Sequence, residues 1–277
     1  MRRAIIDIGT NTVKLLVAEV QAGTVTVLAN RDKTTRLGEG VNHTRHLSPA
    51  AIDRTLDAVN RYLTEARELG ATQIHAIATS AVRDADNRTE FLNACPLPVE
   101  VITGDREAEL IYRGVTSDPA FAGQELVVMD VGGGSAEFIQ AGKRVSLPLG
   151  AVRLTEMFRD EFPALCAHIR QALQPVLSAY RQPHQKIVGT GGTIVTLARV
   201  IQRKADHAVL PEADLRAAVL KLNALPLTER RQVPNLPPDR ADIIVAGGMV
   251  YILALEALGA HEINVSTRNL RYGALLL

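Results

Sequence analysis

Two stretches of the chain share one pattern of apolar and polar positions. In each, an apolar run ends at an aspartate, Asp7 or Asp130, and is followed by a turn of small residues, a second apolar run, a glycine turn and a third run. Short apolar runs bounded by turn residues are typical of strands, so the pattern predicts strands over residues 4–7, 13–20, 24–29, 126–129, 136–140 and 143–147. The two aspartates lie 130 − 7 = 123 residues apart, about half the chain. This period predicts a duplicated domain and not a short repeat of the solenoid kind.

Apolar positions at helical spacing separate further strands in both halves. Ser48 and Pro49 predict the N-cap and first turn of a helix that ends at Gly70. Other helices are predicted over residues 89–94, 106–115 (capped by Asp105), 151–158, 165–177, 194–203, 211–225, 239–258 and after Ser266, with strands over 74–78, 99–102, 187–188 and 262–265. Strands that alternate with helices predict an α/β fold. The connector 117–123 predicts domains 1–121 and 122–277, with about 10 terminal residues packing back on the first domain.

The loops that follow the two aspartates carry the candidate chemistry. Gly9–Thr12 follows Asp7, and Gly132–Ser135 follows Asp130. Glycines let backbone N–H groups approach an anion closely, although three glycines after a strand are also typical of a plain tight turn. Because the chain has this arrangement twice, we interpret both loops as phosphate-binding. A third glycine turn, Gly189–Thr193, opens a helix whose N-terminal amides can face an anion.

Composition narrows the classes of partner. With a net charge of only +1, the whole protein has no electrostatic field that would attract polyanions. Trp is absent, so aromatic side chains on which bases could stack are scarce, and binding to nucleic acid is not expected. Cys95 and Cys166 belong to no metal-binding motif, and a structural zinc site is not expected. The longest apolar run, 243–255, contains two glycines and is too short to span a bilayer. No signal-like core follows Arg2-Arg3, so we expect a cytoplasmic protein that does not bind membranes.

Several segments, taken in order along the chain, resemble those of one family. They are residues 7–16, 36–40, 79–87, 104–111, 130–137, 189–193 and 265–273. The sequence resembles the exopolyphosphatase / guanosine pentaphosphate phosphohydrolase family, within the actin-like, sugar-kinase-like phosphotransferase superfamily. This resemblance implies two ribonuclease-H-like (actin-like ATPase) domains with the active site in the cleft between them. It also implies hydrolysis of a terminal phosphoanhydride, with Mg²⁺ or Mn²⁺ as cofactor, in a homodimer.

The resemblance also implies roles for individual residues. Glu107 falls on the position of the family's catalytic glutamate and would orient or deprotonate the attacking water. Arg83, with Lys14 or Arg36, would offset the charge that develops on the transferred phosphoryl group. The implied phosphate-binding residues are Gly9, Thr10, Asn11, Thr12, Lys14, Gly132, Gly133, Gly134, Ser135, Gly191 and Gly192. The implied metal site is formed by Asp130 and Glu137, with Asp7 as a contributor.

Two positions depart from the family pattern. Arg106 precedes Glu107 where an acidic residue is common, and Asn269 stands where glycine is usual. Asn tolerates a left-handed backbone better than most residues, so the turn at Asn269 is expected to survive.

Several functions fit a protein of this kind. Inorganic polyphosphate is the first choice of substrate, and guanosine pentaphosphate offers the same terminal anhydride. A non-enzymatic sensor would have lost Glu107 or the loop at Asp130, and both are present. A sugar kinase or an ATP-driven chaperone of the same superfamily is generally larger, and a kinase needs an acceptor pocket that no motif here specifies. An actin-like filament would sediment in a nucleotide-dependent manner.

Overall fold

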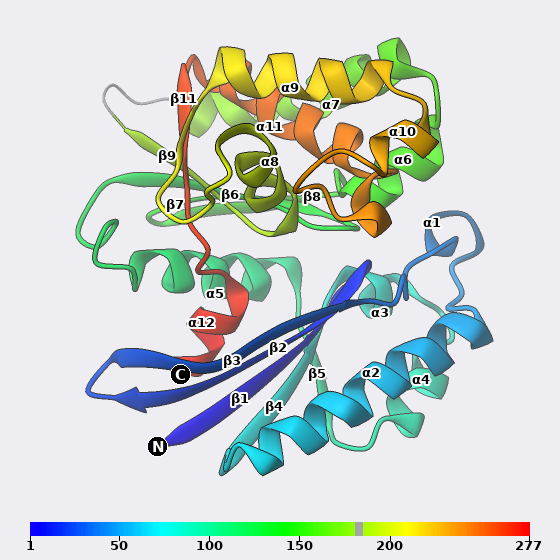
Figure 1. Cartoon of the computed structure of the whole chain (residues 1–277), viewed down its shortest axis with the longest axis vertical. Helices are drawn as coiled ribbons and strands as arrows, with labels where there is room; N and C mark the ends of the chain where they lie inside the picture. The colour runs from blue at the N-terminus through cyan, green and yellow to red at the C-terminus, as the bar shows by residue number, and fades with distance from the viewer. Residues whose placement is uncertain (181–184) are drawn as a thin grey trace. The chain divides into compact units, whose positions relative to one another are not determined.

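The computed structural model describes residues 1–180 and 185–277 and divides the chain into two compact units. The first unit consists of residues 1–114 and 270–277, and the second of residues 115–269. Figure 1 gives the order of the elements and places both chain ends beside the sheet of the first unit. The boundary falls between residues 114 and 115, so the connector 117–123 lies in the second unit, where the Asp118 carbonyl accepts the amides of Phe121 and Ala122 in a turn.

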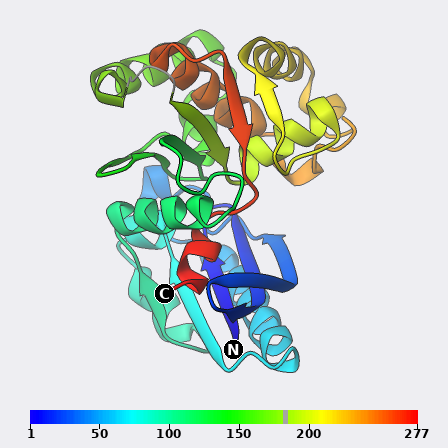
Figure 2. The same ribbon diagram turned by 90° about the vertical axis from the view of Figure 1, so that its left-hand side faces the viewer.

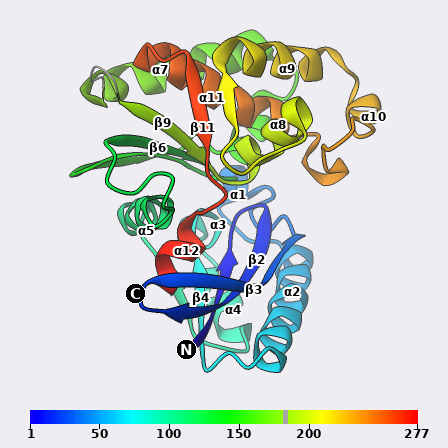
Figure 3. The same cartoon turned by 60° about the vertical axis from the view of Figure 1, so that its left-hand side comes forward.

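The first unit is built on a five-stranded mixed sheet of order β3-β2-β1-β4-β5. Its first three strands form an antiparallel meander, and β4 and β5 continue the sheet in parallel with β1. Helices α2 and α12 both contact β1 and β2 and lie on opposite faces of this sheet (Figure 3). The elements are β1 Arg2–Ile8, β2 Thr12–Gln21, β3 Thr24–Thr34, α1 Val41–Thr44, α2 Pro49–Glu68, β4 Gln73–Ala78, α3 Ser80–Asp84, α4 Arg88–Ala94, β5 Val99–Val101, α5 Gly104–Thr116 and α12 Leu270–Leu275.

The second unit repeats the meander in a six-stranded sheet of order β10-β11-β9-β6-β7-β8. Figure 2 shows β11 between β9 and β10. Strands β6, β7 and β8 are antiparallel neighbours, while β9 runs parallel to β6. The elements are β6 Leu126–Val131, β7 Ala136–Gln140, β8 Lys143–Leu147, α6 Ala151–Phe158, α7 Phe162–Leu177, β9 Lys186–Thr190, α8 Gly192–Gln202, β10 Val209–Pro211, α9 Glu212–Ala224, α10 Leu227–Arg230, α11 Ile244–Leu258 and β11 Glu262–Val265.

Helix α11 is the centre of the second unit's core. It contacts α6, α7, α8, α9 and β6, and nearly all of its side chains are buried. The helix is apolar all round, as is typical of a helix covered on every side by protein. Among the described residues, no helix has the length and apolarity needed to cross a membrane.

The mixed α/β architecture predicted from the sequence is confirmed, and a few local predictions were wrong. Helix α11 begins at Ile244 and not at Asp239, because residues 238–240 form a separate 3-10 turn. Helix α5 begins at Gly104, so Asp105 lies inside its first turn and does not precede it, and the hydroxyl of Thr103 accepts the Arg106 amide at 3.2 Å. The expectation that the turn at Asn269 survives is not among them, since Asn269 does not adopt a positive φ and has no need of a left-handed backbone.

Candidate active site

The first loop, Gly9–Thr12, is held through its carbonyl oxygens. The Thr10 carbonyl accepts the amide of Gly38, and the Asn11 carbonyl accepts the amides of Thr35 and Arg36. Within the described part of the chain, the amides of Thr10 and Asn11 have no hydrogen-bond partner, and neither has the buried Oδ1 of Asn11. Buried polar groups in folded proteins are normally paired. The loop therefore has two amides and an amide oxygen that are unused by the protein.

The second loop, Gly132–Ser135, is held in the same manner by the start of α6. The Gly132 carbonyl accepts the Ala151 amide at 2.9 Å, and the Gly133 carbonyl accepts the amides of Val152 and Arg153 at 2.9 and 3.2 Å. The guanidinium of Arg153 also donates to the Gly134 carbonyl at 2.8 Å.

Three amides of the second loop have no hydrogen-bond partner among the described residues, those of Gly133, Gly134 and Ser135, while the Gly132 amide donates to the Ser135 carbonyl. Gly150 allows the close approach of α6, since a Cβ there would overlap the backbone of Gly133 and Gly134. Fixed carbonyls with adjacent unused amides are the arrangement that a phosphate-binding loop requires.

Charged side chains stand beside each loop, in rows across neighbouring strands. In the first unit, Asp7 pairs in register with Lys14, and their charged atoms lie 4.0 Å apart. In the second unit, Asp130 pairs with Glu137, which in turn pairs with Ser146. Residues directly opposite in an antiparallel pair lie on the same face of the sheet. The first loop therefore has a neutralised aspartate, whereas the second has two carboxylates on one face.

The two carboxylates of the second unit differ in exposure. Glu137 is 1% exposed, and its Oε1 accepts a hydrogen bond from the Ser146 hydroxyl at 2.7 Å. Asp130 is half-buried at the open end of β6. A carboxylate that is oriented by a hydroxyl from behind is a common feature of metal sites, and the sequence analysis missed Ser146.

The third glycine turn lies directly against Asp130. Gly191 has φ of 87° and ψ of 177°, a conformation that is open essentially only to glycine. A Cβ on Gly191 would overlap Asp130 Oδ1 and lie 3.0 Å from its Cγ. A Cβ on Gly192 would likewise overlap the guanidinium of Arg240. The structure thus brings Gly191, Gly192 and Asp130 together, as one cluster within the second unit.

The two predicted catalytic side chains of the first unit meet each other. Glu107 stands in the first turn of α5, and its Oε2 accepts a hydrogen bond from Arg83 Nη1 at 3.2 Å. The same nitrogen donates to the Ile102 carbonyl at 2.9 Å, which fixes the guanidinium at the end of β5. Arg106, which departs from the family pattern, pairs with Glu109 at 2.9 Å and not with Glu107. Arg36 contributes its backbone amide to the first loop.

Comparison with known proteins identifies the family. A model of the Ppx/GppA phosphatase family matches residues 16–277. The chain belongs to the Ppx/GppA phosphatase family. Exopolyphosphatase 2 of Mycobacterium tuberculosis is 32% identical over 312 aligned positions, which cover 99% of this chain and 98% of that protein.

Solved structures agree with this assignment. A Ppx/GppA family member from Aquifex aeolicus superposes with a TM-score of 0.82 at 30% identity, over 100% of this chain and 96% of that one. An exopolyphosphatase from Cytophaga hutchinsonii superposes with a TM-score of 0.90 at 28% identity, over 99% and 96% of the two chains. The family resemblance and the fold class inferred from the sequence are thereby confirmed.

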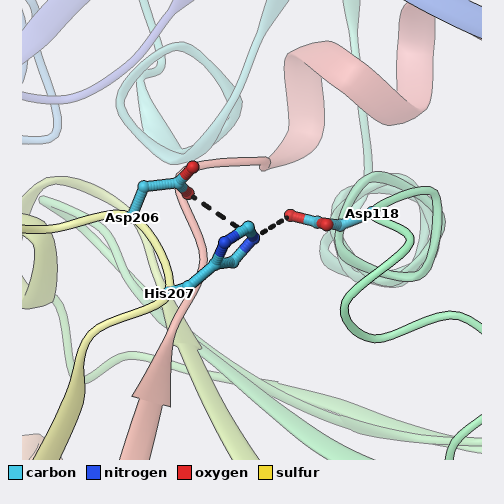
Figure 4. A group of neighbouring side chains, drawn as sticks. All are labelled: Asp118, Asp206 and His207. Carbon is cyan, nitrogen blue, oxygen red and sulfur yellow. Dashed lines mark hydrogen bonds and ion pairs between the residues drawn. The ribbon is translucent and has the colours of Figure 1, made fainter.

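One further polar cluster of this Ppx/GppA chain was not found from the sequence. In the second unit, His207 lies between Asp118 and Asp206 (Figure 4), with its Nε2 2.9 Å from Asp118 Oδ2 and 4.0 Å from Asp206 Oδ1. Arg268 Nε lies 3.8 Å from the same Asp118 oxygen, and its Nη1 donates to the Ser117 carbonyl at 2.7 Å. Since the Arg268 guanidinium already balances the charge of Asp118, we interpret this cluster as an ion-pair network that joins residues 117–118 to Arg268.

Proposed function

We propose that the chain hydrolyses the terminal phosphoanhydride of inorganic polyphosphate and releases orthophosphate. The observation that carries this proposal is the pair of loops, one in each unit, whose carbonyls are fixed by the protein. Among the described residues, nothing accepts the amides of Thr10 and Asn11 in the first loop or those of Gly133, Gly134 and Ser135 in the second. Two such loops suit a substrate that presents several phosphates in a row. The name of the Mycobacterium tuberculosis relative, an exopolyphosphatase, supports this substrate.

The residues around the second loop fit a divalent metal. Asp130 and Glu137 supply two hard oxygen donors on one face, and Ser146 orients one of them. We assign Mg²⁺ to these residues, with Mn²⁺ as a substitute, and expect Asp7 to contribute less because Lys14 already balances its charge. The metal, when bound, would neutralise phosphate oxygens and polarise the terminal phosphoryl group.

Glu107 is the proposed general base. A water oxygen attacks the terminal phosphorus, the bridging P–O bond breaks, the water's proton passes to the Glu107 carboxylate, and the shortened polyphosphate leaves with the bridging oxygen. Arg83 holds Glu107 in position through its 3.2 Å contact. This contact supports a positioning role for Arg83 in addition to the charge-offsetting role expected from the family.

The loop amides of both units are the proposed phosphate ligands. Gly9–Thr12 and Gly132–Ser135 supply amides and hydroxyls, and the Gly191–Gly192 turn adds the N-terminus of α8. We assign Lys14 to the same set as a charge next to the first loop. We further propose a homodimer, as the family resemblance implied, and a cytoplasmic location, as expected from the N-terminal sequence.

Guanosine pentaphosphate is the second candidate substrate. Its 5′ terminal anhydride would use the same loops and the same base, and the family as a whole includes phosphatases of the GppA type by its description. The two substrates differ in the guanine base, so a direct comparison of turnover distinguishes them.

The test is phosphate release from medium-chain polyphosphate and from guanosine pentaphosphate with Mg²⁺, for the wild type, Glu107→Gln and Glu109→Gln. Glu109 is the matched control, because it is a carboxylate of the same helix that is paired with Arg106. Glu107→Gln should lower kcat about 10²–10⁴-fold while the substrate still binds, since positioned proton transfer contributes an acceleration of that size. Glu109→Gln should retain wild-type turnover. A Glu107→Gln variant as active as the control would refute the role of Glu107, and a wild type that binds polyphosphate without releasing phosphate would indicate a sensor.

A further inference from the structure

A single buried hydroxyl joins the ends of two strands of the second unit. Tyr251, on α11, is fully buried. Its hydroxyl donates to the Thr190 carbonyl at 2.6 Å and accepts the Val131 amide at 3.1 Å. Val131 and Thr190 are the last residues of β6 and β9, which lead into the second loop and the third glycine turn. One side chain therefore connects the starting points of both segments.

The duplicated first unit has no need of such a hydroxyl. There, β1 and β4 stay paired up to Ile8 and Ala78, and the Thr79 amide bonds the Ile8 carbonyl at 3.3 Å. In the second unit the pairing of β6 with β9 ends one step earlier, at Asp130 and Thr190.

The cause of this early end is the next residue of the third turn. Gly191, with φ of 87°, turns the chain away from β6. As a result, the Val131 amide of β6 and the Thr190 carbonyl of β9 are not paired with each other across the sheet. Buried backbone groups of this kind require a hydrogen-bond partner. The Tyr251 hydroxyl supplies it and takes the place of the missing rung of the sheet.

The turn that opens at this point is where Asp130 lies. The Asp130 carboxylate lies against Gly191, in space that a Cβ would occupy. On the far side of Asp130, Val131 is held a second time, because the Thr193 hydroxyl donates to its carbonyl at 3.3 Å. The spacing between Asp130 and the glycine turn thus depends on contacts to the backbone of Val131 and Thr190.

We propose that Tyr251 is a positioning residue of the phosphatase reaction. Its hydroxyl fixes the distance between the second loop and the third glycine turn, so that the Asp130 carboxylate and the loop amides face the same metal-bound phosphate. This inference rests on the proposed function, since it assigns Asp130 to the metal and both segments to phosphate.

The test compares Tyr251→Phe with Tyr180→Phe. Tyr180 is the matched control, because it is also buried in the second unit and its hydroxyl donates to a mid-strand carbonyl, that of Phe138, at 3.3 Å. Both variants lose one buried hydroxyl, but only Tyr251 touches the strand ends. Three quantities are measured for each protein: kcat and KM on polyphosphate, affinity for Mn²⁺ by electron paramagnetic resonance without substrate, and thermal unfolding.

We expect Tyr251→Phe to lower Mn²⁺ affinity and kcat about 10–100-fold, the range typical of residues that orient metal ligands. The KM at saturating metal should change much less, and Tyr180→Phe should change only the unfolding temperature. Wild-type Mn²⁺ affinity and kcat in Tyr251→Phe, or equal losses in the two variants, would overturn the proposal. A wild type that releases no phosphate would refute the proposed function instead, and the Mn²⁺ affinities would still decide the role of Tyr251.

Discussion

The contact between Gly191 and Asp130 leads to a sharp test of the proposed metal site. In Gly191→Ala, the new Cβ occupies the space of Asp130 Oδ1 and lies 3.0 Å from Cγ and 3.4 Å from Oδ2. Because the carboxylate itself is in the way, it must turn away from the glycine turn. The substitution therefore displaces the proposed metal ligand without changing its chemistry.

The backbone conformation of Gly191 adds a separate cost to the folding stability of Gly191→Ala, which follows from its φ and ψ angles. At φ of 87° and ψ of 177°, a residue with a Cβ is strained by about 1–3 kcal/mol. Native domains are stable by about 5–15 kcal/mol, so the variant should fold. Its unfolding temperature should fall by about 2–4 °C for each kcal/mol in a chain of this size. The displacement of Asp130 should in addition raise the Mg²⁺ concentration for half-maximal activity, by about 10–100-fold or more.

The assay is phosphate release from polyphosphate across a Mg²⁺ titration, with thermal unfolding measured in parallel. Gly259→Ala is the control, because Gly259 also has a positive φ, of 69°, but a Cβ there meets nothing within 4 Å. This control should lose about 1 kcal/mol of stability and keep its Mg²⁺ dependence. If Gly191→Ala is merely less stable and has an unchanged Mg²⁺ dependence, Asp130 is not the metal ligand and the reasoning from its position is refuted.

Two further predictions concern hydrogen bonds behind the site and away from it. Ser146→Ala removes the donor to the buried Glu137 carboxylate, which should cost about 1–3 kcal/mol in thermal unfolding and raise the Mg²⁺ requirement, while Ser178→Ala on the same unit should do neither. Burial raises the pKa of Asp118, but hydrogen bonds from His207 and a backbone amide, with the nearby Arg268 charge, bring the net pKa below its ordinary value. A lowered pKa stabilises the fold above the unfolded-state pKa of about 3.9, and this stabilisation is lost as the pH falls through the folded-state value. Urea unfolding between pH 7 and pH 3 should therefore show a loss of stability at the acidic end that is smaller in Asp118→Asn; equal slopes would contradict the assignment.

The parts of the site that are continuous in sequence could be predicted from it. Each loop begins two residues after its aspartate, so the apolar run, the carboxylate and the glycines lie together in any fold that buries the strand. The pairing of Glu137 with Ser146 could also have been predicted from the sequence, because a predicted β-hairpin closed at Gly142 sets the register of its two strands. The element bounds differed mainly where a turn replaced the end of a helix, as before Ile244.

Contacts between distant segments could not be predicted in this way. Arg83 and Glu107 lie 24 residues apart, and Val131 and Tyr251 lie 120 apart. Their meeting depends on how helices pack on the sheet, which apolar periodicity does not specify. A signal for Tyr251 was nonetheless present, because it is a tyrosine within an apolar helix, and a buried tyrosine hydroxyl normally has a hydrogen-bond partner.

The duplication offers a reason why the proposed metal site lies in only one half of the chain. Both halves deliver an aspartate to the next-to-last position of a strand that leads into a glycine loop. At the neighbouring position across the sheet, however, the first half has Lys14 and the second has Glu137. Lys14 balances the charge of Asp7, whereas two neighbouring carboxylates repel each other, and a cation beside them would relieve that repulsion. A phosphate next to the second loop would add more negative charge. The difference at this single aligned position, with the backbone plan kept, therefore supports the proposal that the first loop binds phosphate without a metal and the second binds it with one.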